Sequence, residues 1–196
     1  KSKLEGENNI LKNFPLATIL RPSVVYSVDD NFTTNLMTLL SRMPIFPIFY
    51  NGSTKFSPIH CSDLTDTIYY IISNNIYSKV IECVGPETYT FKQILNQLLE
   101  LMNKKRLLFP IPLFIAEIQA RIFELMPNPL LTRDQLKLLK YDNIKSGKYK
   151  TNSEIGIPSV RKFNQEVKKY CYMWKDGGQF STEKYLIEKD FDNKIS

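Results

Sequence analysis

The chain has 196 residues, of which 43% are hydrophobic and 12% aromatic, enough to bury one sizeable core. This composition excludes disorder throughout the chain, and 11 Pro beside 7 Gly exclude collagen-like and low-complexity proteins. Lys and Arg number 26 against 20 Asp and Glu, which leaves a net charge of +6 and favours anionic partners. Because no nucleic-acid motif accompanies this charge, we expect no nucleic-acid binding.

The apolar segments are too short to cross a bilayer. The longest run, Leu107–Ala116, is interrupted by Pro110 and Pro112 and falls short of the roughly 20 residues that a spanning helix needs. We therefore expect no transmembrane segment. The charged start leads into no signal-peptide core, which indicates a cytosolic compartment. Because the first residue is Lys1 and not Met, we expect a processed chain or the remainder of a longer protein.

The sequence offers few metal ligands. It contains three cysteines and a single histidine, without the spacing of a zinc site, so we expect no metal. Cys61 and Cys83 fall in predicted strands, and we interpret both as small buried hydrophobic residues.

Helices and strands are expected to alternate in the first half of the chain. The hydrophobic spacing predicts helices over 2–12, 32–40, 62–74 and 91–102, and strands over 17–20, 54–60 and 79–84. The predicted N-caps are Asp29 or Asp30, Ser62 or Asp63, and Thr90. The apolar stretch 43–51 carries two prolines, which favours an irregular crossover over a strand.

The second half of the chain is predicted to be mostly helical. After a short strand over 106–109, we expect helices over 113–126, 133–141 and 159–172, with a loose tail from Trp174 onward. The apolar surface of the helix over 113–126 suits either a core or the docking face of a membrane-associated partner.

This order of elements predicts an α/β fold with a parallel sheet. The alternation supplies too few strands for a complete two-layer domain, so it is typical of the C-terminal part of a doubly wound, Rossmann-like sheet. We expect residues 1–84 to form that part, without its N-terminal half. Residues 85–173 are expected to form a smaller α-rich domain, and residues 174–196 a flexible tail.

Three segments resemble successive signatures of the extended and atypical short-chain dehydrogenase/reductases. These segments are residues 2–7, 17–26 (Ala-Thr-Ile-Leu-Arg-Pro-Ser-Val-Val-Tyr) and 58–64 (Pro-Ile-His-Cys-Ser-Asp-Leu). Residues 85–91 and 131–143 are similar to one branch of that family. The branch contains the NADPH-binding accessory subunit of respiratory complex I and its bacterial homologues.

The resemblance implies an incomplete cofactor site. In the family, a Tyr-x-x-x-Lys fingerprint supplies a catalytic tyrosine and a lysine that binds the nicotinamide ribose. Lys3 matches that lysine, so it is implied as a cofactor contact, and as a catalytic residue only with a tyrosine from upstream. Pro22, Ser23 and Val25 are implied as further cofactor contacts, because this loop passes the nicotinamide in the family. No glycine here stands in a pyrophosphate-binding loop, so NADP or NAD is expected only with the missing half.

Several site residues keep a plainer interpretation. Lys3 and Lys55 also suit solvated lysines, although Lys55 is a candidate for binding an anionic substrate group. His60 is expected to be a strand residue more than a catalytic base, and Asp63 a helix cap or a structural hydrogen-bond acceptor. Ser27 stands where the family usually has Gly, which puts the conformation of this loop in doubt.

Three functions follow from the resemblance. The first is an accessory or assembly-type protein of complex I, or one linked to quinone metabolism. The second is an NAD(P)-dependent reductase or sugar-nucleotide epimerase/dehydratase that acts with a separate N-terminal half. The third is an inactive remnant of a split gene. The expected partner is complex I or another membrane-associated assembly. The expected location is the cytoplasm or the inner face of the membrane, or the matrix side of the mitochondrial membrane in a eukaryote.

Overall fold

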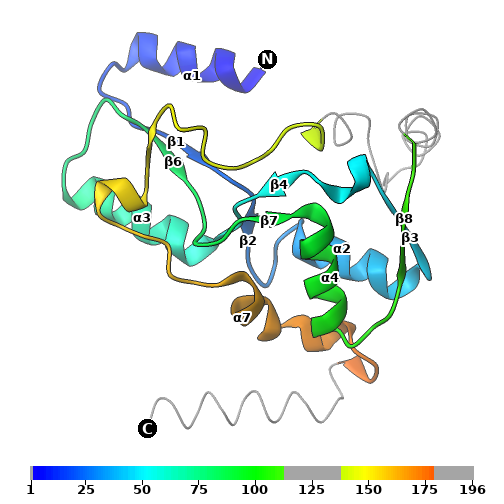
Figure 1. Cartoon of the computed structure of the whole chain (residues 1–196). Helices are drawn as coiled ribbons and strands as arrows, with labels where there is room; N and C mark the ends of the chain where they lie inside the picture. The colour runs from blue at the N-terminus through cyan, green and yellow to red at the C-terminus, as the bar shows by residue number, and fades with distance from the viewer. Residues whose placement is uncertain (1, 113–137, 179–196) are drawn as a thin grey trace, which may run out of the picture.

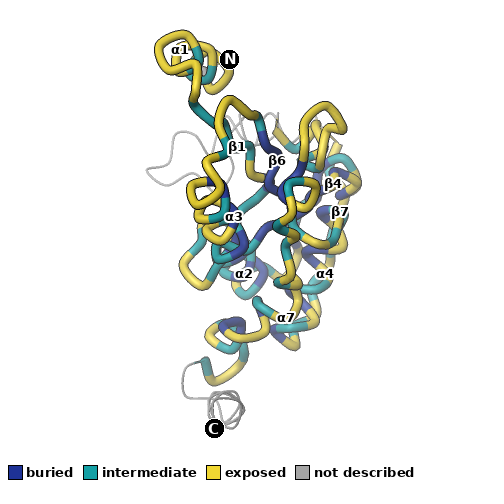
Figure 2. Tube along the Cα trace, turned by 90° about the vertical axis from the view of Figure 1, so that its left-hand side faces the viewer, coloured by how far each residue is buried: buried dark blue, intermediate teal, exposed yellow. Residues whose placement is uncertain are grey.

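A short parallel sheet lies at one end of the molecule in the computed structural model, which describes residues 2–112 and 138–178 (Figure 1). The strand order is β1-β6-β9, with β1 at Ile19–Pro22, β6 at Val80–Cys83 and β9 at Lys150–Thr151. Helix α1 (Ser2–Asn13) lies on one side of these strands and α3 (Cys61–Ser73) on the other, in both Figure 1 and Figure 2. The expected α/β class with parallel strands is confirmed.

The central strand β6 is the buried one. Ile81, Glu82 and Cys83 are buried, because β6 is the middle strand of the sheet and parallel sheets are covered on both faces by the segments that connect their strands. Ile81 and Cys83 pack with Ile59 and Ile71 in a small core beside α3. The prediction that Cys83 is buried is confirmed.

A second, larger core lies among the helices at the other end. It surrounds α4 (Phe91–Leu101), whose residues Ile94, Leu95 and Leu98 are fully buried. Helices α2 (Thr33–Arg42) and α7 (Phe163–Lys168) and the turn η3 (Cys171–Trp174) pack around it. Figure 2 shows this burial around α4, whereas the surface of α1 is largely exposed.

The remaining described strands form three two-stranded pairs. Strand β2 (Val25–Tyr26) pairs in parallel with β5 (Ile59–His60), and β4 (Lys55–Phe56) pairs antiparallel with β7 (Tyr89–Thr90). Strand β3 (Ile45–Ile48) pairs in parallel with β8 (Leu107–Pro110), and the turn η1 (Tyr50–Gly52) follows β3. The single strand expected over 54–60 is therefore two short strands, separated by Ser57 and Pro58.

The prediction of an irregular crossover over 43–51 was wrong, because β3 forms there. A two-stranded sheet contains only edge strands, so the missing N–H of Pro47 can face away from the partner strand. The final helix expected over 159–172 is also shorter, consisting of α7 and then η3.

Each of the three helices with a predicted N-cap can be compared with the structure. The Thr90 cap is confirmed and is a complete capping box with Gln93. The N-cap residue of α2 is Phe32 and makes no side-chain cap bond, so the Asp29 or Asp30 cap was wrong, although Asp30 Oδ1 still accepts from the Thr34 N–H at 2.9 Å. At α3 the cap is His60, whose Nδ1 accepts from the Ser62 N–H at 3.2 Å. Neither Ser62 nor Asp63 is the cap there.

Two further expectations are corrected, and others lie outside the described residues. Cys61 begins α3 and is half-buried, so it is not in a strand. Trp174 does not begin a loose tail, because its Nε1 donates to Thr38 Oγ1 at 2.9 Å and its ring packs on the helical core. The helix predicted over 113–126 and most of the one over 133–141 lie outside the described residues.

Candidate functional site

The segment that follows β1 is bound to residues from a distant part of the sequence. The Ser23 N–H donates to the Cys83 carbonyl at 2.9 Å, which continues the pairing of β1 with β6. The Ser23 hydroxyl donates to the Asn143 carbonyl at 2.8 Å. Ligands of open α/β sheets bind at the carboxyl ends of the strands. Asn143 therefore lies at the edge of the sheet where a ligand is expected.

Residues 138–143 are held against this edge by several further hydrogen bonds. The Thr54 hydroxyl donates to the Leu139 carbonyl, and the Lys55 N–H donates to Asp142 Oδ1 at 2.8 Å. In return, the Asn143 N–H donates to the Lys55 carbonyl at 2.7 Å. These bonds fix the 138–143 segment as one wall of a pocket.

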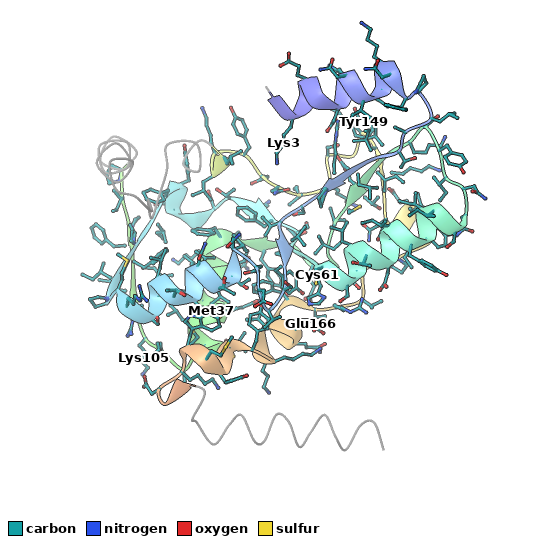
Figure 3. The ribbon with its side chains drawn as sticks, turned by 180° about the vertical axis from the view of Figure 1, so that it is seen from behind. Lys3, Met37, Cys61, Lys105, Tyr149 and Glu166 are labelled. Atoms are coloured by element: carbon teal, nitrogen blue, oxygen red, sulfur yellow. The ribbon has the colours of Figure 1, made fainter. Side chains whose placement is uncertain are left out.

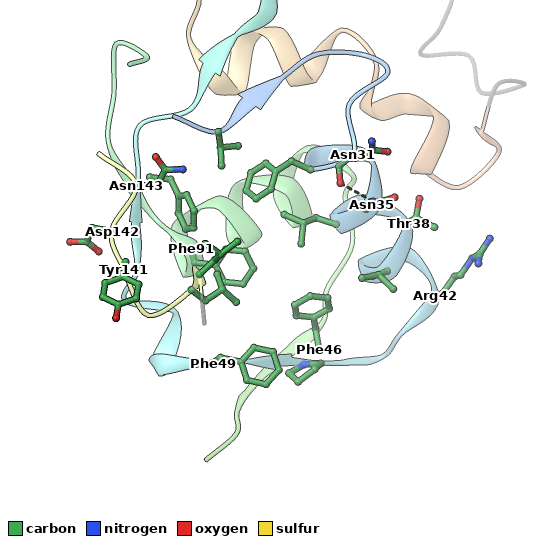
Figure 4. A pocket seen from close by; sticks show the side chains of 18 of the residues that line it. Asn31, Asn35, Thr38, Arg42, Phe46, Phe49, Phe91, Tyr141, Asp142 and Asn143 are labelled. Atoms are coloured by element: carbon green, nitrogen blue, oxygen red, sulfur yellow. Dashed lines mark hydrogen bonds between the residues drawn. The ribbon is translucent and has the colours of Figure 1, made fainter. Parts of the chain in front are cut away.

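A pocket of about 900 Å³ lies between this segment, α2 and α4 (Figure 4). Lys3 of α1 and Val24 of the loop after β1 also line it. Most of its surface is apolar. The apolar lining residues include Phe32, Leu36, Leu39, Phe46, Pro47, Phe49, Phe56, Phe91, Leu138 and Leu139.

A polar stripe, formed by Asn31 and by residues of α2, makes up the other wall. Asn31, Asn35, Thr38 and Arg42 recur at the spacing of one helix face and line the pocket (Figure 4). Asn35 Nδ2 donates to the Asn31 carbonyl at 2.7 Å. The pocket thus suits a ligand with a long apolar or aromatic part and polar or anionic groups that reach Lys3 or Arg42.

The predicted site residues differ in their exposure and in whether they line this pocket. Lys3 is exposed and lines the pocket, and the loop after β1 reaches it through Val24. Pro22 is exposed, Ser23 is buried with its hydroxyl bonded to Asn143, and Val25 is half-buried in β2. Cofactor contact by these residues stays a prediction.

Lys55 was predicted as a site residue, whereas Asn143 and the polar stripe near α2 were not. Lys55 is exposed and meets the pocket wall only through its backbone bonds to Asp142 and Asn143. Its role in anion binding stays a prediction. The polar stripe near α2 was missed, although its spacing is visible in the sequence. The contribution of Asn143 has no local signal in the sequence.

Tyr26 and His60 serve the structure around the pocket. The Tyr26 ring is fully buried, and its hydroxyl donates to the Arg161 carbonyl at 3.3 Å. Burial raises the pKa of the Tyr26 phenol far above its usual value, so the phenol stays protonated. Burial also lowers the pKa of His60, against the opposing effect of Glu166. Neutral His60 is the form whose Nδ1 accepts the capping hydrogen bond of α3.

Charged side chains join α3 to the segment before α7. Asp63 is buried and accepts from the Arg161 N–H at 3.1 Å and from Arg161 Nη1 at 2.5 Å. Arg161 Nη1 also donates to Asp66 at 2.9 Å, and a Glu166 carboxylate oxygen lies 3.9 Å from His60 Nε2. The interpretation of Asp63 as a structural hydrogen-bond acceptor is confirmed.

The residues at this edge suit a ribose and ring at one end of a dinucleotide better than the pyrophosphate in its middle. The ammonium of Lys3, which lines the same pocket as Val24, suits a ribose and its attached ring. A pyrophosphate needs a glycine-rich turn between a strand and a helix, and no such turn occurs in residues 2–112 and 138–178. Gly85, which follows β6, serves close packing: a Cβ there would lie 1.7 Å from the Pro58 carbonyl oxygen. Within the same residues, no three His, Cys, Asp or Glu side chains are arranged for a metal.

Comparisons of sequence place the chain beside subunits of the respiratory chain. No protein-family model matches it. It is 30% identical over 101 residues to the mitochondrial NADH dehydrogenase (ubiquinone) 1 alpha subcomplex subunit 9 of Dictyostelium discoideum, which covers 51% of the chain and 28% of that protein. It is 24% identical over 159 residues to the mitochondrial NADH-ubiquinone oxidoreductase 40 kDa subunit of Neurospora crassa, covering 80% and 41%. The chain therefore spans less than half the length of both relatives.

Another relative is an enzyme, and solved structures share the fold. The ceramide reductase of Caulobacter vibrioides is 26% identical over 112 residues, covering 57% of the chain and 35% of that protein. The structure of RMD from Pseudomonas aeruginosa complexed with NADPH superposes with a TM-score of 0.61 at 10% identity, covering 89% of the chain and 55% of that structure. A dTDP-4-dehydrorhamnose reductase from Clostridium acetobutylicum gives 0.59 at 18% identity, covering 86% and 52%.

These similarities confirm the resemblance seen in the sequence. The fold is the Rossmann-like α/β fold of the nucleotide-dependent reductases, dehydratases and epimerases. In sequence, the chain is similar to subunits of the mitochondrial NADH-ubiquinone oxidoreductase, which is respiratory complex I. Within the residues that the structure describes, no helix is both long and apolar enough to cross a membrane.

Proposed function

We propose that this chain is part of an NAD(P)-binding, short-chain dehydrogenase/reductase-like protein that acts as an accessory or assembly-type subunit of respiratory complex I. The observation that carries this proposal is the sequence similarity to complex I subunits from a slime mould, mammals, a plant and a fungus. A role in the quinone chemistry next to that complex is the finer form of the same proposal. The fold supports it, because known structures with this fold bind NAD or NADPH.

In this proposal, NADP or NAD extends along the carboxyl edge of β1. Lys3 contacts the nicotinamide ribose, and Pro22, Ser23 and Val25 form the rest of this wall. The position of Lys3 on the same pocket as Val24 supports this arrangement. The bound dinucleotide supplies hydride-transfer chemistry where a substrate reaches it. Lys3 takes a catalytic role only if a tyrosine from a preceding segment adjoins it.

The same proposal assigns domains and a location. Residues 1–84 belong to the cofactor-binding domain, and residues 85–173 to the smaller domain that closes over it. In a eukaryote the protein lies on the matrix side of the inner mitochondrial membrane, as its mitochondrial relatives suggest. In a bacterium it lies at the cytoplasmic face of the membrane.

The association with complex I is tested on the native protein. A tag placed after Ser196 allows membranes of the source cells to be solubilised mildly and resolved on a native gel. We expect the tagged protein to co-migrate with NADH dehydrogenase activity, and we expect that activity to fall when the gene is deleted. A tagged protein that migrates alone, in cells whose complex I activity survives deletion, contradicts the proposal.

The cofactor assignment is tested separately on the purified complete protein. Denaturation should release NADP or NAD, measured by an enzymatic cycling assay. We expect Lys3→Met to lower the retained cofactor about tenfold, as for the loss of one charge-assisted hydrogen bond. The matched control is Lys12→Met on the same helix, which lies outside the pocket. Equal retention in both variants would remove Lys3 from the site.

A second candidate is a lipid-active reductase. It is favoured by the similarity to a ceramide reductase together with the apolar pocket. The complete protein should then oxidise NADPH in the presence of a long-chain keto substrate, followed at the absorbance of the reduced nicotinamide. Turnover that survives Lys3→Met unchanged would count against this candidate.

A further inference from the structure

The β3-β8 ribbon, formed by Ile45–Ile48 and Leu107–Pro110, carries an exposed apolar face at one edge of the molecule (Figure 1). Its register places Ile45 beside Leu107 and Pro47 beside Phe109. Alternate residues of a strand share a face, so these four side chains form one surface. Ile45, Leu107 and Phe109 are 52%, 59% and 53% exposed. We call these four residues the outer face of the ribbon.

The opposite face holds the ribbon firmly in place. Phe46 and Ile48 are buried in the large helical core, and Leu108 packs against the same core. The Ile111 N–H donates to the Ile48 carbonyl at 3.0 Å and extends the pairing beyond β8. The outer face therefore cannot turn inward without breaking this packing. A contiguous exposed apolar surface on a fixed element is typical of a binding surface.

Three cations gather at the amino end of the ribbon. The two strands run in parallel, so the residues that precede them meet at the same end. Arg42 ends α2 just before β3, and Lys105 and Arg106 directly precede β8. Arg106 donates to the carbonyls of Leu40 at 2.8 Å and Ser41 at 3.2 Å, which fixes its guanidinium against the last turn of α2. Lys105 is exposed and extends from the edge of the molecule (Figure 3).

The nearby acidic groups do not neutralise this cluster. Asp176 is paired with Lys104 at 2.8 Å, and that bond lowers the pKa of Asp176, with a further contribution from Arg106. In the described part of the chain, no ion pair includes Arg42, Lys105 or Arg106. The amino end of the ribbon is thus positive and adjoins an apolar surface.

We propose that the outer face of the β3-β8 ribbon docks on an anionic lipid bilayer. A bilayer presents phosphates directly above an apolar layer, which matches cations at one end of an apolar face. Ile45, Leu107 and Phe109 enter the boundary between headgroups and acyl chains, while Arg42 and Lys105 reach lipid phosphates. The chain's net charge of +6 adds attraction at longer range. Arg42 and Pro47 also line the pocket beside α2, but the proposal is argued from the ribbon and the cations at its amino end and does not depend on the proposed function.

The electrostatic part is tested by sedimentation with lipid vesicles. The complete protein is mixed with vesicles of phosphatidylcholine, with or without phosphatidylglycerol. We expect binding only where phosphatidylglycerol is present, with affinity that falls as salt is added. The double variant R42Q/K105Q should bind about 30-fold more weakly. The matched control is K12Q/K79Q, which removes two exposed cations from α1 and from the loop before β6.

The apolar part is tested by fluorescence quenching in vesicles of brominated lipid. Phe109→Trp places a fluorophore on the outer face, and Tyr69→Trp places one at a 73% exposed position of α3. The native Trp174 provides the baseline. We expect bromine to quench the Phe109→Trp protein beyond that baseline, and the Tyr69→Trp protein not to exceed it. Equal quenching in both variants would overturn the proposal.

Two other results would also overturn it. One is equal loss of binding in R42Q/K105Q and K12Q/K79Q, which would indicate general charge attraction without a defined surface. The other is failure of the folded protein to bind any vesicle, which would leave an acidic protein as the partner of this face. Thermal melts followed by circular dichroism check that each variant is folded, so weaker binding reports on the surface and not on unfolding.

Discussion

The two ends of the molecule differ in how completely they bury their own apolar surface. Within the described residues, sixteen buried side chains form the core around α4, whereas four form the core beside β6. At the sheet end, Leu4 and Ile10 of α1 and Phe14, which follows the helix, remain exposed, and within the described part of the chain β1 pairs with a strand on one side only. Within these residues, the helical end therefore buries more apolar side chains than the sheet end, and we expect it to contribute more to the stability of the chain. The sheet end presents surfaces that other polypeptide can cover.

Leu98→Ala is expected to cause the largest loss in the free energy of unfolding, and to do so at the helical end. Leu98 lies in the core of the helical end with none of its surface exposed, so truncation leaves a cavity and should lower the free energy of unfolding by about 2–5 kcal/mol. Leu4→Ala, at a 59% exposed position of α1, should change it by less than about 0.5 kcal/mol. Urea titrations measure both. Equal losses in the two variants would mean that the ends do not differ in this way.

A smaller effect is expected at the joint between the two ends. Asp63→Asn removes the charge that accepts two hydrogen bonds from Arg161, while the side chain keeps its size. We expect a loss of about 2 kcal/mol in the free energy of unfolding, in the range found for hydrogen bonds to charged groups. Asp66→Asn, at the exposed partner of the same arginine, should cost under about 1 kcal/mol. A larger loss in Asp66→Asn than in Asp63→Asn would show that the exposed ion pair, and not the buried one, is the stabilising contact.

A still smaller loss is expected from removing a helix cap. Thr90→Ala abolishes the capping box of α4 and should lower the free energy of unfolding by about 1 kcal/mol. Thr65→Ala serves as the control, because the exposed Thr65 hydroxyl only bonds back to the carbonyl of Cys61 within α3. An effect of Thr65→Ala as large as that of Thr90→Ala would show that cap and helix surface matter equally here.

The smallest effect is a dependence of stability on pH at the same joint. Burial lowers the pKa of His60 below its ordinary value of 6.5, although Glu166 and Asp63 oppose this shift and Arg161 and Lys169 add to it. The unfolded chain then binds the proton more tightly. The contribution of His60 to stability is therefore complete above pH 6.5 and is lost as the pH falls below it. In His60→Gln, urea midpoints should vary less across this range; an unchanged slope would assign the dependence to other groups.

The sequence predicted those elements whose signals are local. The helical spacing of Ile94 and Leu98 and the Thr90 cap lie within a few residues of one another, so α4 was placed correctly. Strand β3 was misassigned because its partner β8 follows about sixty residues later, and only that pairing permits Pro47 in a strand. The cap of α3 was misassigned because a histidine acceptor is rare, whereas serine and aspartate are common caps.

The candidate site was predicted only in part, for a related reason. Lys3 and the loop after β1 were found through motifs. The other wall of the pocket consists of Asn143 and its neighbours, which are held by the Ser23 hydroxyl and by backbone bonds to Lys55. Hydrogen bonds between such distant segments leave no pattern in a single sequence. A pocket whose walls come from both halves of the chain therefore needed the structure.

The close approach at Gly85 has a consequence for the tolerance of this chain to mutation. A Cβ at this position would lie 1.7 Å from the Pro58 carbonyl oxygen, and the Gly85 N–H donates to the neighbouring Ser57 carbonyl at 3.0 Å. The chain leaving β6 and the turn between β4 and β5 thus touch backbone to backbone. Every other amino acid at residue 85 would force the two apart, so a single substitution there separates the sheet from the strands that lead to the helical core.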